Sequence, residues 1–423
     1  GSLGTWYYYT HDREAGERFY TAAFAHSSRL ADWEQLDLRA TRALYRGNTD
    51  SSLSLARMRA ARFPGADTWT ALGTALMRAD HDSEAIDAFE RGLRLDSLRV
   101  FAWINLATSN AKLRRYEQSR LAYTRAERVD SSVLYQNNFN NEYGRALVHL
   151  DRLADAESAF RRMANGPRIE NRALGLRSLA LLDFWRGRVD DAINDFGQAI
   201  DATRQMQSPL SEGRNHLLLA TVFRATNRLA DANAEVSKTL TLAAAPAFEP
   251  PMLGILAYEC ARLDRVADVD RIVAMVRARA DSDDAVDQAT VAFATAVAHA
   301  AHHRPDSALT YLSRAASFPW PIPRLMLKAE EFSAQRQVDS VKSTLLAVLT
   351  AEGFGAEGED DWMRTPLLLG DALLATKDTA GAVRRYRDIV SQWRDAPADL
   401  PDLVAAKARL AAIGGAGREK SAR

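Results

Sequence analysis

The first candidate for chemistry in this sequence is a glycine-rich stretch, Gly353-Phe-Gly-Ala-Glu-Gly358, which has the spacing G-x-G-x-x-G. In dinucleotide-binding proteins this spacing lets the backbone approach a pyrophosphate, and it requires a strand before it and a helix N-terminus after it. Here a helical pattern precedes the stretch, and Glu359-Asp-Asp361 follows it, which would repel phosphate. The stretch therefore predicts a flexible loop between helices and no nucleotide cofactor.

Two further groups contain residue types that bind metals. His299, His302 and His303 have a spacing that places side chains on one helical face, but no carboxylate or cysteine nearby in the sequence completes a set of ligands. Asp281-Ser-Asp-Asp284 begins like a calcium loop but lacks the Gly and Glu that such a loop requires further on, so we interpret it as a helix N-cap. The sequence predicts no metal site.

Nucleophilic catalysis finds no support either. The single cysteine, Cys260, falls at a core position of a predicted helix, where a buried and inert thiol is expected. No Ser/His/Asp or Cys/His arrangement is accompanied by a motif, so we expect no catalytic residues and no enzyme. One cysteine allows no intrachain disulfide and suits a reducing compartment, which favours the cytoplasm. An extracytoplasmic part of a membrane-anchored protein remains open as an alternative.

The composition limits the classes of partner. The 423 residues include 55 Lys and Arg and 55 Asp and Glu, so the net charge gives no reason to expect nucleic acid as a partner. No apolar run approaches the ~18 residues that a spanning helix needs, so no membrane insertion is predicted. Gly1-Ser2 resembles an expression scar, and neither an initiator Met nor a signal peptide follows it. We therefore expect a segment of a longer protein.

The elements that must position any site are helical pairs, and the clearest pair is Ala66–Arg99. Apolar and small residues recur in it at helical spacing. They are Trp69, Leu72, Gly73 and Leu76 on the first helix, and Ala85, Phe89 and Gly92 on the second. These types and offsets resemble the tetratricopeptide repeat (TPR) unit, and similar units return along the chain with a period near ~34 residues. The resemblance implies an all-α TPR solenoid, a right-handed superhelix of about ten helix-turn-helix pairs with a C-terminal capping helix.

This pattern divides the chain into five regions. They are a partial repeat at 1–32, a regular TPR array at 33–249, degenerate helical repeats at 250–362, a final TPR with a capping helix at 363–413, and a disordered tail at 414–423. Within the degenerate region, Phe318–Pro323 contains three prolines that predict a break in helix, and Ala351–Asp361 predicts an acidic loop. The capping helix is expected over Pro401–Ile413, ending before Gly414.

Two stretches carry a more specific resemblance. Ser28-Arg-Leu-Ala-Asp-Trp-Glu-Gln-Leu-Asp-Leu-Arg39 resembles the start of the TPR regions of large bacterial signalling proteins, and Ser391–Leu410 is similar to their end. The family is the bacterial eukaryotic-type serine/threonine kinases, with related regulators, that carry a C-terminal TPR array. None of the kinase motifs is found in this sequence. The resemblance therefore implies a sensory or docking region without the enzyme.

The resemblance also implies where a ligand would bind, because the first helix of each TPR pair lines a concave groove. At the exposed positions of these helices the middle units offer amides, cations and one aromatic residue. They are Asn105, Thr108, Lys112, Asn138, Asn141, Arg145, His149, Arg177, Trp185, Arg214 and Arg224. Amides can pair with a peptide backbone, and Arg can bind carboxylates through two hydrogen bonds. We expect these residues, apart from Thr108 and His149, to bind an extended peptide that carries acidic side chains.

The sequence thus predicts a non-catalytic scaffold that binds a protein or a peptide. Two alternatives remain open. The first is a self-association module that forms a homo-oligomer through exposed repeat faces and takes no peptide. The second is a small-molecule sensor that holds its ligand where the repeats lose their pattern, around Pro246–Pro251 or Phe318–Pro323.

Overall fold

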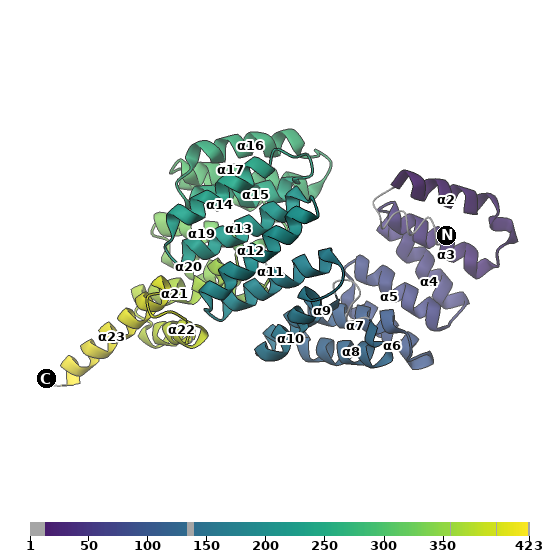
Figure 1. Cartoon of the computed structure of the whole chain (residues 1–423), viewed down its shortest axis with the longest axis horizontal. Coiled ribbons are helices and arrows are strands. Elements are labelled where there is room, and N and C mark those ends of the chain that lie inside the picture. The colour runs from purple at the N-terminus through teal and green to yellow at the C-terminus, as the bar shows by residue number, and fades with distance from the viewer. Residues whose placement is uncertain (1–12, 133–138, 356, 395, 422–423) are drawn as a thin grey trace. The chain divides into compact units, whose positions relative to one another are not determined.

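The computed structural model describes residues 13–132, 139–355, 357–394 and 396–421. Over these ranges the chain folds into α-helices packed as consecutive pairs, and no strand occurs in them (Figure 1). The residues form two compact units, Gly1–Ala159 and Phe160–Arg423, called unit 1 and unit 2 below. The all-α TPR-type solenoid that the repeat pattern predicts is confirmed.

The described residues of unit 1 start with one α-helix and a short 3-10 helix and continue with helical pairs. The first elements are α2 (Arg13–Ala25) and the short 3-10 helix Ser27–Arg29. The pairs are α3 (Asp32–Tyr45) with α4 (Thr49–Arg62), α5 (Ala66–Arg78) with α6 (Asp82–Leu95), and α7 (Val100–Lys112) with α8 (Tyr116–Val129). Next come α9 (Phe139–His149) and α10 (Leu153–Ala164), in which the boundary between the units falls.

Unit 2 contains six pairs and a terminal helix in its described residues. They are α11 (Ile169–Trp185) with α12 (Val189–Gln205), α13 (Pro209–Ala225) with α14 (Leu229–Leu242), α15 (Pro250–Arg262) with α16 (Val266–Arg279), α17 (Ala285–Ala301) with α18 (Pro305–Arg314), α19 (Pro321–Ala334) with α20 (Val338–Thr350), α21 (Glu359–Ala375) with α22 (Thr379–Gln392), and α23 (Pro401–Ser421). In every pair the first helix is called helix A and the second helix B.

The turns inside the pairs share one backbone conformation. A residue just after helix A adopts a positive φ, as at Asp80 (57°), Asp264 (57°) and Lys377 (66°). This left-handed conformation ends a helix and lets the next one begin within a few residues. Gly47 (79°) and Gly187 (78°) do the same without steric cost. The repeated turn explains why helix pairs of nearly constant length follow one another.

The core of several pairs contains the same kind of contact between helix A and helix B. A small residue of helix A faces a larger residue that lies sixteen positions later on helix B. In the α5/α6 pair a Cβ added at Gly73 would lie 2.6 Å from the ring of Phe89, which is fully buried. Gly370 faces the ring of Tyr386 in the same way in α21/α22. This contact fixes how closely the two helices approach and is used below.

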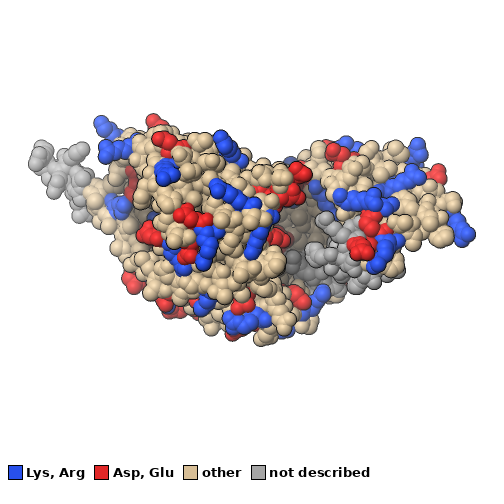
Figure 2. Space-filling view, turned by 90° about the horizontal axis from the view of Figure 1, so that it is seen from above, with Lys and Arg blue, Asp and Glu red and all other residues tan. Residues whose placement is uncertain are grey.

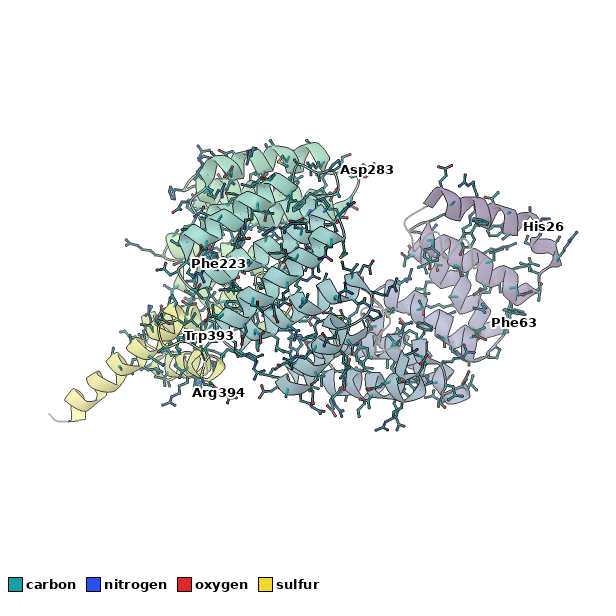
Figure 3. All side chains as sticks on the ribbon, in the orientation of Figure 1. His26, Phe63, Phe223, Asp283, Trp393 and Arg394 are labelled. Atoms are coloured by element: carbon teal, nitrogen blue, oxygen red, sulfur yellow. The ribbon has the colours of Figure 1, made fainter. Side chains whose placement is uncertain are left out.

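Other apolar side chains complete the interior. Phe223 of α13 and Trp393, just after α22, are 6% and 2% exposed (Figure 3). In the space-filling view, basic and acidic side chains are interspersed over the face in view (Figure 2), as the zero net charge predicts. None of the described helices combines the length and the apolar character needed to cross a membrane.

Several details differ from the sequence-based expectations. Pro321 and Pro323, expected to break helix, lie in the first turn of α19, where a missing backbone N–H is tolerated. The terminal helix continues to Ser421 and does not end before Gly414. Of the partial repeat expected at 1–32, residues 1–12 lie outside the described residues.

Candidate functional site

The helices A at the start of unit 2 bring several cations to one groove. Arg177 lies on α11, Arg214 and Arg224 lie near the two ends of α13, and Arg262 is the last residue of α15. These side chains are largely covered, although arginine is rarely buried without a partner. Their environment therefore has to supply negative charge.

That charge comes from the acidic end of the glycine-rich stretch. The Arg214 guanidinium lies 2.5 Å from the Glu357 carboxylate. Arg224 donates to Asp360 at 2.7 Å, and Arg262 lies 3.0 Å from Asp361. Since Glu357 and Asp360 are at most 5% exposed and Asp361 is fully buried, these ion pairs are shielded from water. The groove of unit 2 is thus filled by an acidic segment, 357–361, of the chain itself.

Aromatic side chains anchor the same segment on both sides. The ring of Trp362 stacks on Trp185 with the ring centroids 5.0 Å apart, and Phe354 meets Trp185 edge-on at 5.7 Å. Phe354 also stacks on Phe160 at 5.9 Å. Trp185, which we expected in a peptide site, is therefore covered by the chain's own residues and is only 9% exposed.

The glycines of the G-x-G-x-x-G stretch have structural explanations. A Cβ at Gly353 would collide with the Trp362 indole, and Gly355 and Gly358 adopt φ values of 71° and 86°. The Gly355 amide donates to the Glu359 carboxylate at 2.9 Å, which closes the turn. The prediction of a flexible loop is wrong for the described residues here, because Phe354 is only 1% exposed and the turn packs tightly in the groove.

The polar cluster below this segment contains more carboxylates than guanidiniums. Arg224 donates hydrogen bonds to both Asp360 and Glu259, and its bond to Glu259 is 3.2 Å long. Arg262 also donates to Glu330, at 2.8 Å. Burial and the neighbouring Asp360 carboxylate raise the pKa of Glu259 to about 7, despite the opposing Arg224. Burial likewise raises the pKa of Asp360 and of Glu330. Such a cluster retains a proton near neutral pH.

Within this cluster Asp361 behaves differently. Although burial opposes its ionisation, the Arg262 and Arg224 cations and the hydrogen bond from Tyr258 lower its pKa below the usual value. The Tyr258 hydroxyl donates to Asp361 at 2.6 Å and accepts from Arg262 at 2.8 Å. Asp361 is therefore the anionic centre around which the other groups are arranged.

Arg177 lies beside these pairs but makes no hydrogen bond or ion pair of its own within the described part of the chain. Burial and the nearby Arg214 cation lower its pKa to about 9, while Glu357 opposes the shift. The side chain remains protonated at neutral pH. The Glu357 carboxylate compensates the charge of Arg177 from a distance, without direct contact.

In unit 1 the predicted groove residues remain at the surface or half-buried. Asn105 of α7 donates to the Thr74 hydroxyl at 3.3 Å, and Lys112 lies 3.0 Å from Asp80. On α9, Asn141 donates to Glu142 at 3.2 Å, and Arg145 is half-exposed. Asn138 lies outside the described residues. The structure therefore brings Asn105, Lys112, Asn141 and Arg145 to two neighbouring helices A of unit 1, α7 and α9.

Some residues of the unit 2 site were missed by the sequence interpretation. Tyr258, Glu259 and Arg262 follow one another at helical spacing on α15, in a repeat that had lost its signature. One sequence feature could have pointed to this site. The acidic run at 357–361 has the negative charge that the predicted groove arginines need as partners. Nothing in the sequence indicated that the two stretches meet.

The other chemical candidates have structural explanations. His299 stacks on Tyr311, and His302 lies 3.0 Å from Asp270. The Asp284 carboxylate accepts from the backbone N–H of Val286 and Asp287 as an N-cap. No group of three or more His, Cys, Asp or Glu among the described residues has a geometry that could hold a metal ion. Burial raises the pKa of the Cys260 thiol to about 12, so this thiol is unreactive at neutral pH.

Comparisons with known proteins found similar solved structures, all at low sequence identity. A TPR protein from Parabacteroides merdae has 15% identity and a TM-score of 0.46, with 74% of this chain and 98% of that chain covered. The C-terminal part of a TPR protein from Cytophaga hutchinsonii has 12% identity and a TM-score of 0.41, with 56% and 93% covered. PilW, described as a widely conserved type IV pilus biogenesis factor, has 14% identity and a TM-score of 0.37, with 66% and 98% covered. No protein-family model and no curated protein matches the sequence.

Proposed function

We propose that this chain is a non-catalytic scaffold that binds an acidic, extended segment of a partner protein along the helices A of unit 1. The main support for this proposal is the way in which unit 2 binds its own segment 357–361. There, arginines on the successive helices A α13 and α15 bind carboxylates of the segment, and the ring of Trp362, which directly follows the segment, stacks on Trp185. A groove of this kind binds an extended segment at little conformational cost, because the helices are already in place.

The equivalent helix positions of unit 1 carry related chemistry. Lys112 occupies the repeat position that Trp185 occupies in unit 2, and Asn141 occupies that of Arg177. Although partial burial opposes it, the hydrogen bond and the charges of Asp80 and Asp82 raise the pKa of Lys112, which keeps this side chain cationic. Its side chain is 42% exposed and can exchange Asp80 for a partner's carboxylate. The amides of Asn105 and Asn141 can pair with the partner's backbone.

A role within a larger bacterial signalling protein is part of the same proposal. It rests on the resemblance of Ser28–Arg39 and Ser391–Leu410 to the TPR regions of bacterial kinases and related regulators. In this role the chain would dock a partner, while an attached effector domain would supply the activity. The proposal needs no catalytic residue, cofactor or metal in this chain.

Peptide display on the purified chain tests the proposal. We expect selection to enrich extended peptides that carry Asp or Glu, with affinities that fall as salt is added. Binding should weaken by about tenfold or more when Asn105, Lys112, Asn141 and Arg145 are all replaced by Ala. The matched control replaces the exposed Gln118 and Arg125 of α8, on a helix B, by Ala. Failure to enrich acidic peptides, or equal loss in both variants, would overturn the proposal.

A further inference from the structure

A second feature of unit 2 is a cavity of about 360 Å³ between α19, α20 and α21. Its walls include Met326 and Ala329 of α19, Leu345 of α20, and Leu368 and Ala372 of α21. Charged side chains stand at its rim, and none of its lining residues is aromatic. The volume lies in the range of pockets that hold small organic molecules.

The cavity arises from a departure from the repeat pattern. Helix B presents an aromatic ring to the small residue of helix A in several pairs, such as Gly73 with Phe89 and Ala180 with Phe196. In α19/α20 the corresponding residues are Ala329 and Leu345, and both line the cavity. A ring is therefore missing at the place where other pairs contain one.

A neighbouring pair that also lacks this ring has aromatic side chains packed on its helix A. In α15/α16 the residues at these positions are Ala257 and Val273. Next to Gly254 of α15, the buried rings of Phe293 and Phe318 stack on each other with their centroids 4.1 Å apart. No such ring enters between α19, α20 and α21, so the space stays open.

Among the charged residues at the cavity, the basic side chains have more capacity left to bind a ligand than the acidic ones. Both acidic residues are already paired, since Glu330 accepts from Arg262, and Asp371 accepts from Tyr386 and Arg409. The basic residues are not satisfied in the same way. The buried Nε of Arg364 has no hydrogen-bond partner, and its nearest carboxylate, on Asp402, is 3.9 Å away. The exposed Arg336 makes no ion pair within the described residues.

From this combination we propose that the cavity binds a small organic monocarboxylate whose apolar body, aromatic in the best case, replaces the missing ring. Its carboxylate would accept hydrogen bonds from Arg364 and Arg336 at the rim. Bidentate binding by a guanidinium suits a carboxylate, whereas an ammonium accepts no hydrogen bond and a neutral amide offers one acceptor oxygen and no charge. The proposal is independent of peptide binding in unit 1.

Isothermal titration of the full chain with 3-phenylpropionate tests this proposal. We expect saturable binding of the acid, and binding weaker by about tenfold or more for 3-phenylpropanamide and 3-phenylpropylamine, which lack the carboxylate. The variant Leu345→Phe places inside the cavity the ring that other pairs have there. It should abolish binding without lowering the thermal midpoint, because Ala180 with Phe196 shows that a small residue and a ring fit together.

Two further variants make the outcome decisive. Leu346→Phe adds the same ring at a side chain that is 46% exposed on the same helix, and it should bind like the wild type. Arg364→Gln keeps the fold but removes the cation, and should weaken binding of the acid about tenfold and leave that of the amide unchanged. Absence of binding by the wild type would overturn the proposal. Equal binding of acid and amide, or an unchanged affinity in both Leu345→Phe and Arg364→Gln, would overturn it as well.

Discussion

The indole of Trp362 lies flat on the indole of Trp185, with centroids 5.0 Å apart and planes inclined by 23°. Trp185 ends α11 in the first pair of unit 2, and Trp362 lies in the first turn of α21 in the last pair. The stack therefore joins the two ends of the unit 2 array. The Gln392 side chain reinforces this junction by donating to the Trp185 carbonyl at 2.9 Å.

Removing the Trp362 ring should weaken the contact between the first and last pairs of unit 2. We expect Trp362→Ala to destabilise unit 2 by about 2 to 3 kcal/mol, because Trp362 is half-buried and truncation of a fully buried aromatic residue costs about 3 to 5 kcal/mol. Trp185, which this ring covers in the wild type, should then become more accessible to a fluorescence quencher such as acrylamide. Trp33→Ala is the matched control, because Trp33 is 43% exposed in unit 1. Unchanged hydrogen exchange across α11 and α21 in Trp362→Ala would contradict the described junction.

Neutralising the central carboxylate should have a similar effect for a different reason. Asp361→Asn leaves the buried Arg262 with fewer anionic partners, and uncompensated buried charge costs about 3 kcal/mol or more. Hydrogen-exchange mass spectrometry should show lost protection in α15 and α21 while unit 1 is unaffected. Asp283→Asn, at an exposed site in the turn before α17, should leave exchange as in the wild type.

The raised pKa of Glu259 predicts a pH dependence of the opposite sign to that of an ordinary ion pair. Between its usual pKa, near 4.5, and about 7, folded Glu259 holds a proton that the unfolded chain has lost. Stability from this group therefore falls as the pH rises through this interval and is constant above it. Glu259→Gln should remove a fall on the order of 2 kcal/mol from denaturation curves measured between pH 5 and 8. An identical pH slope in both proteins would count against a shared proton in the cluster.

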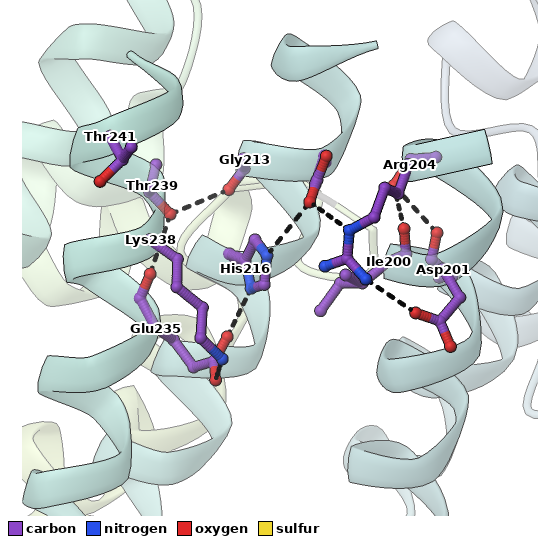
Figure 4. A network of polar contacts seen from close by, with 12 residues as sticks. Ile200, Asp201, Arg204, Gly213, His216, Glu235, Lys238, Thr239 and Thr241 are labelled. Carbon is purple, nitrogen blue, oxygen red and sulfur yellow. Dashed lines mark hydrogen bonds and ion pairs between the residues drawn. The ribbon is translucent and has the colours of Figure 1, made fainter. Parts of the chain in front are cut away.

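A second buried network, between α12, α13 and α14, predicts the ordinary sign (Figure 4). His216 of α13 is hydrogen-bonded to Glu235 at 2.5 Å, and Lys238 donates to the same carboxylate at 2.6 Å. Although burial opposes ionisation, these two bonds lower the pKa of Glu235. Stability from this group should be present above the usual pKa of a glutamate and be lost as the pH falls through the lowered value.

The variant Glu235→Gln tests that expectation. It should destabilise unit 2 by about 1 to 2 kcal/mol at pH 7, because charge-assisted hydrogen bonds are replaced by neutral ones. The difference from the wild type should shrink at pH 3, below the usual pKa of a glutamate, because part of the stability that this carboxylate contributes is lost there. A constant difference at both pH values would show that the network acts through shape alone.

The fold could be predicted from the sequence because the residue pattern of each repeat depends on contacts between residues that are close in the sequence. The spacing of Trp69, Gly73 and Phe89 is set by contacts within one helical pair, and such contacts recur along the chain. The candidate site could be predicted only in part. Arg214 and Arg224 were recognised as groove cations, but their partners, Glu357 and Asp360, come from a pair that lies far along the sequence. Contacts of this kind depend on how the array curves, which no single repeat encodes.

The cavity beside Leu345 shows another limit. The loss of the aromatic residue at this position is visible in the sequence, and so is the same loss at Val236, Val273 and Leu312. What the sequence does not reveal is which of these gaps is filled by a ring from elsewhere. Packing decides this, because a side chain such as Phe318 reaches a core that its own sequence position does not suggest.

The central claim is that unit 1 binds an acidic segment as unit 2 holds its own. The most direct test is the dissociation constant of a display-selected acidic peptide, measured by isothermal titration against the wild type and against the variant in which Asn105, Lys112, Asn141 and Arg145 are Ala. We predict an affinity loss of about tenfold or more in this variant, and a change below about twofold in the control with Gln118→Ala and Arg125→Ala. Equal dissociation constants in all three proteins would contradict the claim.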